Sequence, residues 1–413
     1  MSLGGGSFAA GAAFGGELFC YFVAQAFPAA DLPVKHRASR GGARDAFPNS
    51  FPSEKRQMKK TLTAIALMGV FAGAQAADVS FYGIIDYGMY MNHTDVKTAE
   101  KNVDYDTVEL NSGINAGPLF GLVGEETLGN GYKVSFKLEN GFNADDGTLG
   151  DDNKLFNREA ALTVSADWGS LAMGRMGGVG SSFGTYDLTF AIGDAFDGGD
   201  SAVFGMVTSY RRDNMVTYQT PKLAGIQATA QYSFKMDNTE DTREGHKDSD
   251  RYAGFALTGD FGKLKTVFSY DQDILANTAT RDDAKIVSLG GNYDFELFTL
   301  YAMGQYFEGA NRFVPGNIEA AIGGDSTLIV NGEAYHIGAA SVLPNGYLQG
   351  ALYYMDAKLD DKTGDYEYMG ATVRYTHNLS KRTSLYVGVG YAETDGKFEA
   401  NESQAYFGMT HGF

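Results

Sequence analysis

Apolar and polar side chains alternate over many short stretches of this chain, and this alternation limits its possible folds more than any other feature. A period of two predicts a β-strand with one apolar and one polar face. An aromatic residue that ends such a strand is poorly placed in water but fits an apolar band facing lipid. The last ten residues show the alternation throughout, with Ala405, Phe407, Met409, His411 and Phe413 on one face and Gln404, Tyr406, Gly408, Thr410 and Gly412 on the other.

The same alternation recurs at 225–235, 263–271, 369–376 and 383–391. A length of about ten residues is what a transmembrane strand tilted near 45° requires. After residue 76 the chain holds no apolar run of about 18 residues, which excludes helical membrane spans. The pattern therefore predicts strands with lipid on one side and water on the other.

Short and long connections alternate between the expected strands. Seven short turns and eight long polar loops connect sixteen strands, with both termini on the short-turn side. This predicts an all-β, 16-stranded antiparallel transmembrane β-barrel with an aqueous lumen. The alternative is a soluble all-β sandwich or propeller, but neither needs a charged polar face on so many strands. The turns lie near 129–131, 167–169, 221–223, 260–262, 294–296, 344–346 and 379–381, and the loops near 92–106, 143–156, 177–209, 237–250, 272–284, 309–333, 357–366 and 393–403.

A secretory signal is predicted inside the sequence, at 58–76. Met58-Lys59-Lys60 is basic, a short apolar core follows, and Ala74-Gln75-Ala76 supplies small residues for cleavage. The alternative for this stretch is an ordinary buried helix. Because an export signal must lead its chain, we expect 1–57 to be upstream mistranslation without structure, and 77–413 to be the barrel.

Composition excludes several function classes. The only cysteine, Cys20, precedes residue 77, so the mature part has no thiol chemistry or thiolate metal site. The mature part carries 25 Lys and Arg against 47 Asp and Glu, which makes nucleic acid a poor partner. No His-x-x-x-His pair and no evident Ser-His-Asp arrangement occurs. We therefore expect neither an enzyme nor a metal or cofactor.

Several motifs together resemble the general diffusion porins of Gram-negative bacteria, in particular the betaproteobacterial type. Each motif alone is weak, but in register they cover essentially all of 77–413. The matching motifs are Ser80–Asp86 in the opening strand, Gly121–Gly131 in the second strand and turn, Leu155–Arg158 and Gly174-Arg175 before the third loop, Arg211–Pro221 after it, and Gly408–Phe413 in the closing strand.

The resemblance implies a homotrimer of barrels, each with its own pore, in the outer membrane. It also implies that the third long loop, about 177–209, folds into the lumen and narrows it. Basic wall residues would face acidic loop residues there and produce a transverse field. The residues carried over are Arg158, Arg175 and Arg211 on the wall and Asp187, Asp194, Asp197 and Asp200 on the loop.

Further residues complete the expected sites. Lys133, Lys137 and Arg374 are predicted to line the lumen wall. The closing-strand residues Phe407, Met409, His411 and Phe413 are predicted to form a signal for the barrel-assembly machinery. Membrane lipid and lipopolysaccharide are the other expected partners, besides small hydrophilic solutes and ions.

The expected activity is passive diffusion with a mild preference for cations. Relatives often carry an arginine in the second strand where this chain has Leu119, so the basic wall should be weaker. The alternation along the chain places Arg211 on the same strand face as polar residues, which agrees with a lumen position. It places Arg158 and Arg175 on the same face as apolar residues. A rim or subunit contact is the alternative for these two arginines. A substrate-specific channel and a structural or adhesive surface barrel are the rival functions.

Overall fold

The computed structural model describes residues 78–151, 153–199, 203–237, 244–245, 248–276, 282–313, 318, 327–360 and 364–413. The description below concerns the second of two units of the chain, Ala76–Phe413. The expected upstream segment 1–57, the expected signal 58–76 and Asp200 lie outside the described residues. Within the described ranges, no helix is long and apolar enough to cross a membrane.

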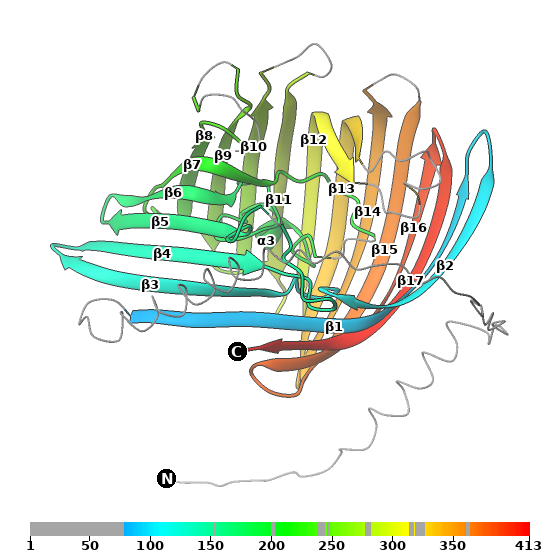
Figure 1. Cartoon of the computed structure of the whole chain (residues 1–413), viewed down its shortest axis with the longest axis horizontal. Helices are drawn as coiled ribbons and strands as arrows, with labels where there is room; N and C mark the ends of the chain where they lie inside the picture. Colours follow the sequence, from blue (N-terminus) through cyan, green and yellow to red (C-terminus); the bar gives the residue numbers. More distant parts are fainter. Residues whose placement is uncertain are drawn as a thin grey trace, which may run out of the picture. The chain divides into compact units, whose positions relative to one another are not determined.

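The second unit is a β-structure with one short helix, α3 (Phe190–Gly193), in the described ranges (Figure 1). Its strands are β1 (Asp78–Lys97), β2 (Asn102–Ser112), β3 (Leu119–Gly129), β4 (Tyr132–Gly141), β5 (Glu159–Ala166), β6 (Gly169–Gly177), β7 (Arg211–Gln219), β8 (Ile226–Ser233), β9 (Arg251–Phe261), β10 (Leu264–Ile274), β11 (Ala284–Asp294), β12 (Thr299–Phe313), β13 (Thr327–Leu343), β14 (Gly346–Leu359), β15 (Asp365–Asn378), β16 (Thr383–Gly396) and β17 (Glu399–Gly412).

These strands form a closed antiparallel barrel with sixteen strand positions. From β3 onward each strand pairs with the next, and β17 returns to pair with β1. β2 and β3 lie on the same side of β1, where β2 pairs with residues 87–97 and β3 with residues 78–84. They are two pieces of one strand position, interrupted at 113–118. The expected count of sixteen is confirmed.

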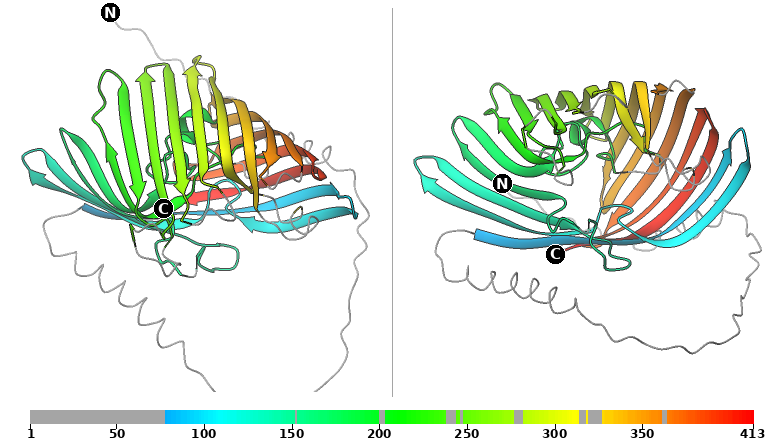
Figure 2. Two further views of the ribbon diagram at one scale, coloured as in Figure 1. Left: turned by 90° about the horizontal axis from the view of Figure 1, so that it is seen from above. Right: turned by 45° about the horizontal axis from the view of Figure 1, so that its top comes forward.

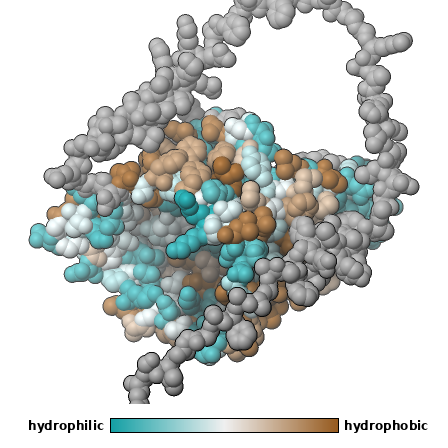
Figure 3. All heavy atoms as spheres, turned by 90° about the horizontal axis from the view of Figure 1, so that it is seen from below, coloured by the Kyte–Doolittle hydropathy of each residue, from teal (hydrophilic) through white to brown (hydrophobic). Residues whose placement is uncertain are grey.

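The two faces of the wall sort as the alternation predicts. In β15, Met369 and Val373 are about half exposed on the outer face, whereas Thr372, Arg374 and Thr376 are buried on the inner face. On the side of the molecule shown in Figure 3, hydrophobic and hydrophilic residues gather in separate areas. The barrel thus carries an apolar outer surface and a polar interior, as a membrane barrel requires.

Several strands extend further toward the long-loop side than expected. β1 and β2 leave only residues 98–101 between them, and β16 and β17 leave only 397–398. The expected loops at 92–106 and 393–403 were therefore wrong in their bounds. The polar residues there continue the ladder, because backbone pairing needs no apolar side chain once a strand has left the lipid.

The outer face changes character near this end. Tyr306, Tyr335 and Tyr354 are exposed on β12, β13 and β14. Their hydroxyls donate to Glu308, Glu333 and Glu367, which lie closer to the loop side. Tyrosines with carboxylates beyond them are typical of the boundary between apolar membrane and water.

The connection between β6 and β7, residues 178–210, folds into the barrel as predicted and carries α3 (Figures 1 and 2). We call it the inner loop. Its Phe190 and Phe204 rings lie edge to face with centroids 5.4 Å apart, and Phe204 meets Tyr353 of β14 at 5.6 Å. These rings belong to one buried apolar cluster with inward side chains of β11 to β17. The inner loop thus packs against one part of the wall.

Candidate functional site

Hydrogen bonds to the wall fix the first part of the inner loop. The Val179 amide donates to the Tyr252 hydroxyl of β9 at 3.1 Å, and the Gly180 amide donates to Asp271 of β10 at 3.1 Å. The Thr189 hydroxyl lies 2.8 Å from both the Val179 carbonyl oxygen and the Ser269 hydroxyl. Inward polar residues of β9 and β10 therefore position the loop before α3.

Asp194 fixes the middle of the inner loop. Its carboxylate accepts the Phe196 and Gly198 amides, each at 3.0 Å, and the Tyr353 hydroxyl at 3.0 Å. His336 Nε2 lies 3.3 Å from the same carboxylate, and neither side chain is exposed. A carboxylate sealed in this way anchors the loop to β13 and β14. The assignment of Asp194 to the acidic side of the pore constriction stays a prediction.

Three wall residues, Gln305, Arg312 and Arg374, hold the later part of the inner loop. Only Arg374 was predicted from the sequence, as a residue of the lumen wall. The Gln305 amide pairs with both the amide and the carbonyl of Val207, each at 3.0 Å. Arg312 is buried, donates to the Phe204 carbonyl oxygen at 2.6 Å and lies 4.5 Å from the Tyr368 ring. Arg374 lies 4.8 Å from the Phe196 ring. No local signal marks Gln305 and Arg312 for this task, because their partners are about a hundred residues away.

Asp187 and Asp197 form an acidic pair on the inner loop, and their predicted place at the pore constriction stays a prediction. Asp197 is partly covered but retains solvent-exposed surface, whereas Asp187 is half-buried and accepts the Ala191 amide at 3.3 Å. Burial and then the nearby Asp197 carboxylate raise the pKa of Asp187 to about 9. Burial also raises the pKa of Asp197. One proton is therefore held between two carboxyl groups near neutral pH.

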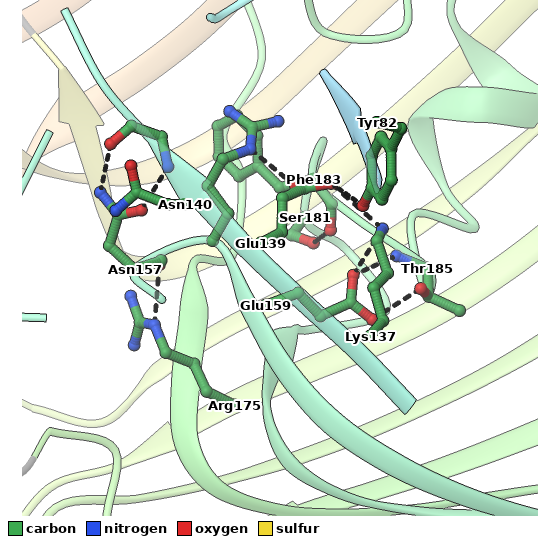
Figure 4. Close-up of polar contacts among 12 residues, drawn as sticks. Tyr82, Lys137, Glu139, Asn140, Asn157, Glu159, Arg175, Ser181, Phe183 and Thr185 are labelled. Carbon is green, nitrogen blue, oxygen red and sulfur yellow. Dashed lines mark hydrogen bonds and ion pairs between the residues drawn. The ribbon is translucent and has the colours of Figure 1, made fainter. Parts of the chain in front are cut away.

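The wall beside the inner loop alternates in charge (Figure 4). Arg158 Nε donates to Glu139 at 2.7 Å, and Lys137 Nζ lies 2.9 Å from Glu159 and 3.5 Å from Glu139. The Thr185 hydroxyl of the inner loop also donates to Glu159, at 2.6 Å. Glu139 and Glu159 are nearly fully buried. Sequence reasoning missed both carboxylates, although each sits on the polar face of its strand.

Arg175 also belongs to the charged wall beside the inner loop, because β6 is irregular at this residue. The register of β6 against β7 shifts between Gly174 and Met176, so the parity that placed Arg175 among apolar residues breaks there. Its Nε donates to the Asn157 carbonyl oxygen at 2.8 Å, and its Nη1 forms an ion pair with Asp213. Arg158 precedes the first residue of β5, so strand parity does not apply to it.

Arg211 differs from the other two wall arginines. Its guanidinium carbon lies 4.2 Å from the centroid of the Phe183 ring of the inner loop. Among the described residues it forms no ion pair, and its Nε and Nη2 have no hydrogen-bond partner. It is therefore the wall cation with the least compensated charge in this group.

The remaining predicted residues fall in three places. Lys137 lines the inner wall, while Lys133 is half-exposed and pairs with Glu125 at 2.6 Å near the short-turn end. Arg374 is buried on the inner face of β15. Met409 of β17 and Phe413, which follows the end of β17, are exposed on the outer face, and His411 Nδ1 lies 2.9 Å from the Thr383 hydroxyl. Phe407 is half-buried on the same face.

Charged and hydroxyl-bearing side chains surround open space beside the inner loop. A cavity of about 340 Å³ beside the inner loop is lined by residues including Lys137, Glu159, Ser135, Thr163 and Thr185. In the described part of the chain, no group of three or more His, Cys, Asp or Glu is placed to hold a metal ion. Paired charges and hydroxyls around open space suit the passage of hydrated ions and polar molecules.

Comparison with known proteins agrees over most of the chain. The family model of the Gram-negative porins matches residues 61–397. An outer membrane porin protein of Bordetella pertussis is 32% identical over 400 residues, covering 86% of this chain and 100% of that protein. Outer membrane porin protein 32 of Delftia acidovorans is 29% identical over 341 residues, covering 81% and 89%.

Solved structures share the fold. An anion-selective porin from Comamonas acidovorans superposes with a TM-score of 0.57 and 21% sequence identity, covering 82% of this chain and 100% of that chain. At this identity the likeness concerns the barrel architecture alone. Its agreement with the sixteen strand positions is independent of the motifs discussed above.

Proposed function

Because this chain belongs to the Gram-negative porin family and lies in the outer membrane, we propose that its barrel is a passive diffusion channel for ions and small hydrophilic solutes, with a mild preference for cations. It is a channel protein and not an enzyme. The observation that carries the proposal is the polar interior narrowed by an inner loop, with charged side chains around open space. Solutes would move down their own gradients, so no energy-coupled element is required.

The charge balance at the inner loop supports a weak selectivity. Arg158, Arg175 and Lys137 pair with Glu139, Asp213 and Glu159, and Lys154 also pairs with Asp213, whereas Arg211 forms no ion pair among the described residues. A narrowing that is close to neutral gives little preference of its own. The acidic excess of the whole barrel then attracts cations toward the channel mouths, weakened by salt screening beyond about 8 Å.

The first test is the reversal potential of the purified protein in a salt gradient across a planar bilayer. We expect a cationic sign, and an anionic sign would contradict the selectivity while leaving diffusion intact. A protein that folds but conducts no ions would contradict the channel itself. Saturable block by one sugar or one anion would instead favour a substrate-specific channel.

Glu139→Gln provides a directed version of this test. It removes the carboxylate between Arg158 and Lys137, so both cations become less compensated and the reversal potential should shift toward anions. Asp260→Asn is the matched control, because Asp260 pairs with Lys222 at an exposed turn. Equal shifts in the two variants would show that net charge alone matters, against our assignment.

We also propose the finer assignments that follow from family membership. The protein would assemble as a homotrimer in contact with lipopolysaccharide, with 58–76 removed on export and 1–57 absent from the mature protein. The outer-face residues Phe407, Met409, His411 and Phe413 would be read by the barrel-assembly machinery. Mass measurement of the detergent-extracted protein tests the trimer, and amino-terminal sequencing tests the start near residue 77.

A further inference from the structure

The interruption between β2 and β3 contains more residues than the opposite strand needs. Tyr87 pairs with Ser112, and Ile84 pairs with Leu119. Two residues of β1, at 85 and 86, therefore face the six residues 113–118, so four residues are in excess. We call this segment, Gly113-Ile114-Asn115-Ala116-Gly117-Pro118, the wall excursion; it contains no ionisable side chain.

The wall excursion leaves the strand and returns to nearly the same point. Gly113 has a φ of +76°, which a glycine adopts without strain. A methyl group placed on Gly113 would lie 3.0 Å from Cδ of Pro118, so the two ends of the excursion touch. The four residues 114–117 therefore project from the wall as a closed bend.

Asp86 holds the bend on the inner side of the barrel. Its buried carboxylate accepts the Asn115 amide at 3.2 Å, the Tyr386 hydroxyl at 2.9 Å and the Thr410 hydroxyl. The Asn115 side-chain amide donates to Thr410 at 2.9 Å. Asp86, Tyr386 and Thr410 share the inner face of β1, β16 and β17, so Asn115 lies over that face.

Gly88 of β1 makes room for the bend because it has no side chain. A methyl group on Gly88 of β1 would lie 2.7 Å from Cδ1 of Ile114 and 2.7 Å from the Tyr386 hydroxyl. Ile114 therefore covers the inner surface of β1 at a place where only glycine fits. Three strands and the excursion are packed together at this point of the lumen wall.

The excursion lies beside the residues that surround the inner loop. A methyl group on Gly117 would lie 3.2 Å from Nη1 of Arg158, which belongs to the charged wall of Figure 4. On its other side, Tyr386 interacts with the charge of Arg374, and Arg374 contacts Phe196 of the inner loop. The excursion thus lies beside Arg158 of the charged wall on one side and beside Tyr386 on the other.

We propose that the wall excursion is a second constriction element of the pore, which narrows the path from the side of β1 and β17. This rests on the proposed diffusion function. The excursion limits solutes by bulk and by peptide hydrogen-bonding groups, because it has no charge. It therefore determines the size limit for neutral solutes, whereas the charged wall and the acidic pair determine the ion preference. Asp86 is its positioning residue.

Deletion of residues 114–117 tests the proposal directly. The deletion removes the four excess residues and preserves strand parity, so Gly113 would pair with Asp86 and Pro118 with Ile85. The Pro118 carbonyl accepts the Phe142 amide at 3.2 Å, so its nitrogen faces β4 and is not needed for pairing with β1.

We expect single-channel conductance of the deletion variant to rise roughly 1.5- to 2-fold, because conductance scales with the cross-section at the narrowest point. Larger neutral sugars should also enter proteoliposomes.

The conductance of the wild-type protein separates the proposed diffusion channel from the proposed second constriction. A wild-type protein that does not conduct would contradict the channel, whereas a conducting wild type and a folded deletion variant with the same conductance and sugar limit would overturn the second constriction alone.

Ala116→Cys tests the proposal without removing any residue. Residues 77–413 contain no cysteine, so in protein that amino-terminal sequencing shows to begin near residue 77, a new thiol is the only target for a methanethiosulfonate reagent. Modification of half-buried Ala116→Cys should lower conductance by adding bulk to the narrowing. Lys381→Cys, on an exposed turn, is the control and should be modified without this loss. Complete modification of Ala116→Cys with unchanged conductance would overturn the proposal even if the deletion variant failed to fold.

Discussion

At the scale of single residues, carboxylates of the same loop have different tasks because their surroundings differ. Asp194 is sealed by two amides, a hydroxyl and a histidine, so it serves as an anchor. Burial and the neighbouring Asp197 raise the pKa of Asp187 to about 9 instead, so Asp187 holds a proton near neutral pH. A buried carboxylate is tolerated when its oxygens are hydrogen-bonded, and two adjacent carboxylates are tolerated when one is neutral.

The acidic pair should make ion selectivity depend on pH. The raised pKa of Asp187, about 9, means that its proton leaves as pH rises through that value, which adds one negative charge to the lumen. Cation preference should therefore increase between about pH 7 and pH 10, as measured by reversal potential. Asp187→Asn should remove most of this increase, whereas Asp146→Asn on an exposed outer loop should retain it. An unchanged increase in Asp187→Asn would assign the effect to other groups.

The same pair has a consequence for the stability of the inner loop. Because the folded pKa of Asp187 is raised, its contribution to stability is fully present below the unfolded pKa, near 4, and is lost as pH rises toward about 9. Cleavage of the inner loop by a protease added to detergent-solubilised protein should therefore accelerate at alkaline pH. Asp187→Asn should show a smaller acceleration, and an identical pH profile in both proteins would contradict this account.

At the scale of the strand, the outer face has a depth profile. Leu289 lies in the middle of β11 and is 65% exposed, whereas Val342 lies beside the short turn after β13 and is 88% exposed. Exposure alone would rank Val342 as the more lipid-facing residue. Its position at the end of a strand places it near the membrane surface instead, where a charge can reach water.

Arginine substitutions should report this depth. Leu289→Arg should destabilise the barrel by about 2–4 kcal/mol, because the charge lies near the bilayer midplane, and Val342→Arg by about 0–1 kcal/mol. Reversible urea unfolding in lipid vesicles measures both. Equal costs for the two substitutions would contradict the assignment of the outer face to lipid, and would favour a barrel held in an aqueous assembly.

At the scale of the whole molecule, closure depends on contacts between the two ends of the described chain. Gly83 and Phe413 exchange backbone hydrogen bonds of 3.2 and 3.0 Å. The Phe413 ring lies 5.7 Å from the Phe81 ring and over Gly83, where a methyl group would meet it at 2.3 Å. The final residue therefore completes the seam between β17 and β1 (Figure 1).

Phe413→Ala should weaken this seam without removing its backbone bonds. We expect a loss of about 1–2 kcal/mol in the free energy of unfolding, from the buried part of the ring and its contact with Phe81. Leu379→Ala, at an exposed turn, is the control and should change stability little. A stability equal to wild type combined with slow assembly in cells would assign Phe413 to recognition during assembly and not to the closed seam.

Much of the fold could be predicted because strand parity is a local property. Alternation over ten residues predicted both faces of β15 and β17, and the alternation of short turns and long loops predicted sixteen positions. The inward third loop was implied by the resemblance to the porins and not by the local pattern. The predicted face of a side chain was uncertain where contacts with a neighbouring strand interrupt the alternation along the chain. Arg175 was ambiguous because a bulge at Gly174 resets parity, and a bulge depends on the partner strand.

The sequence by itself determined which side chains face lipid and which face water, because a period of two needs only neighbouring residues. The tertiary structure alone decided which charges compensate each other, that Asp194 is an anchor, and that residues 113–118 turn inward over Asp86. Those outcomes include pairs such as Arg158 with Glu139, 19 positions apart, which meet once β4 pairs with β5, and Asp86 with Thr410, 324 positions apart, which meet only once the barrel has closed.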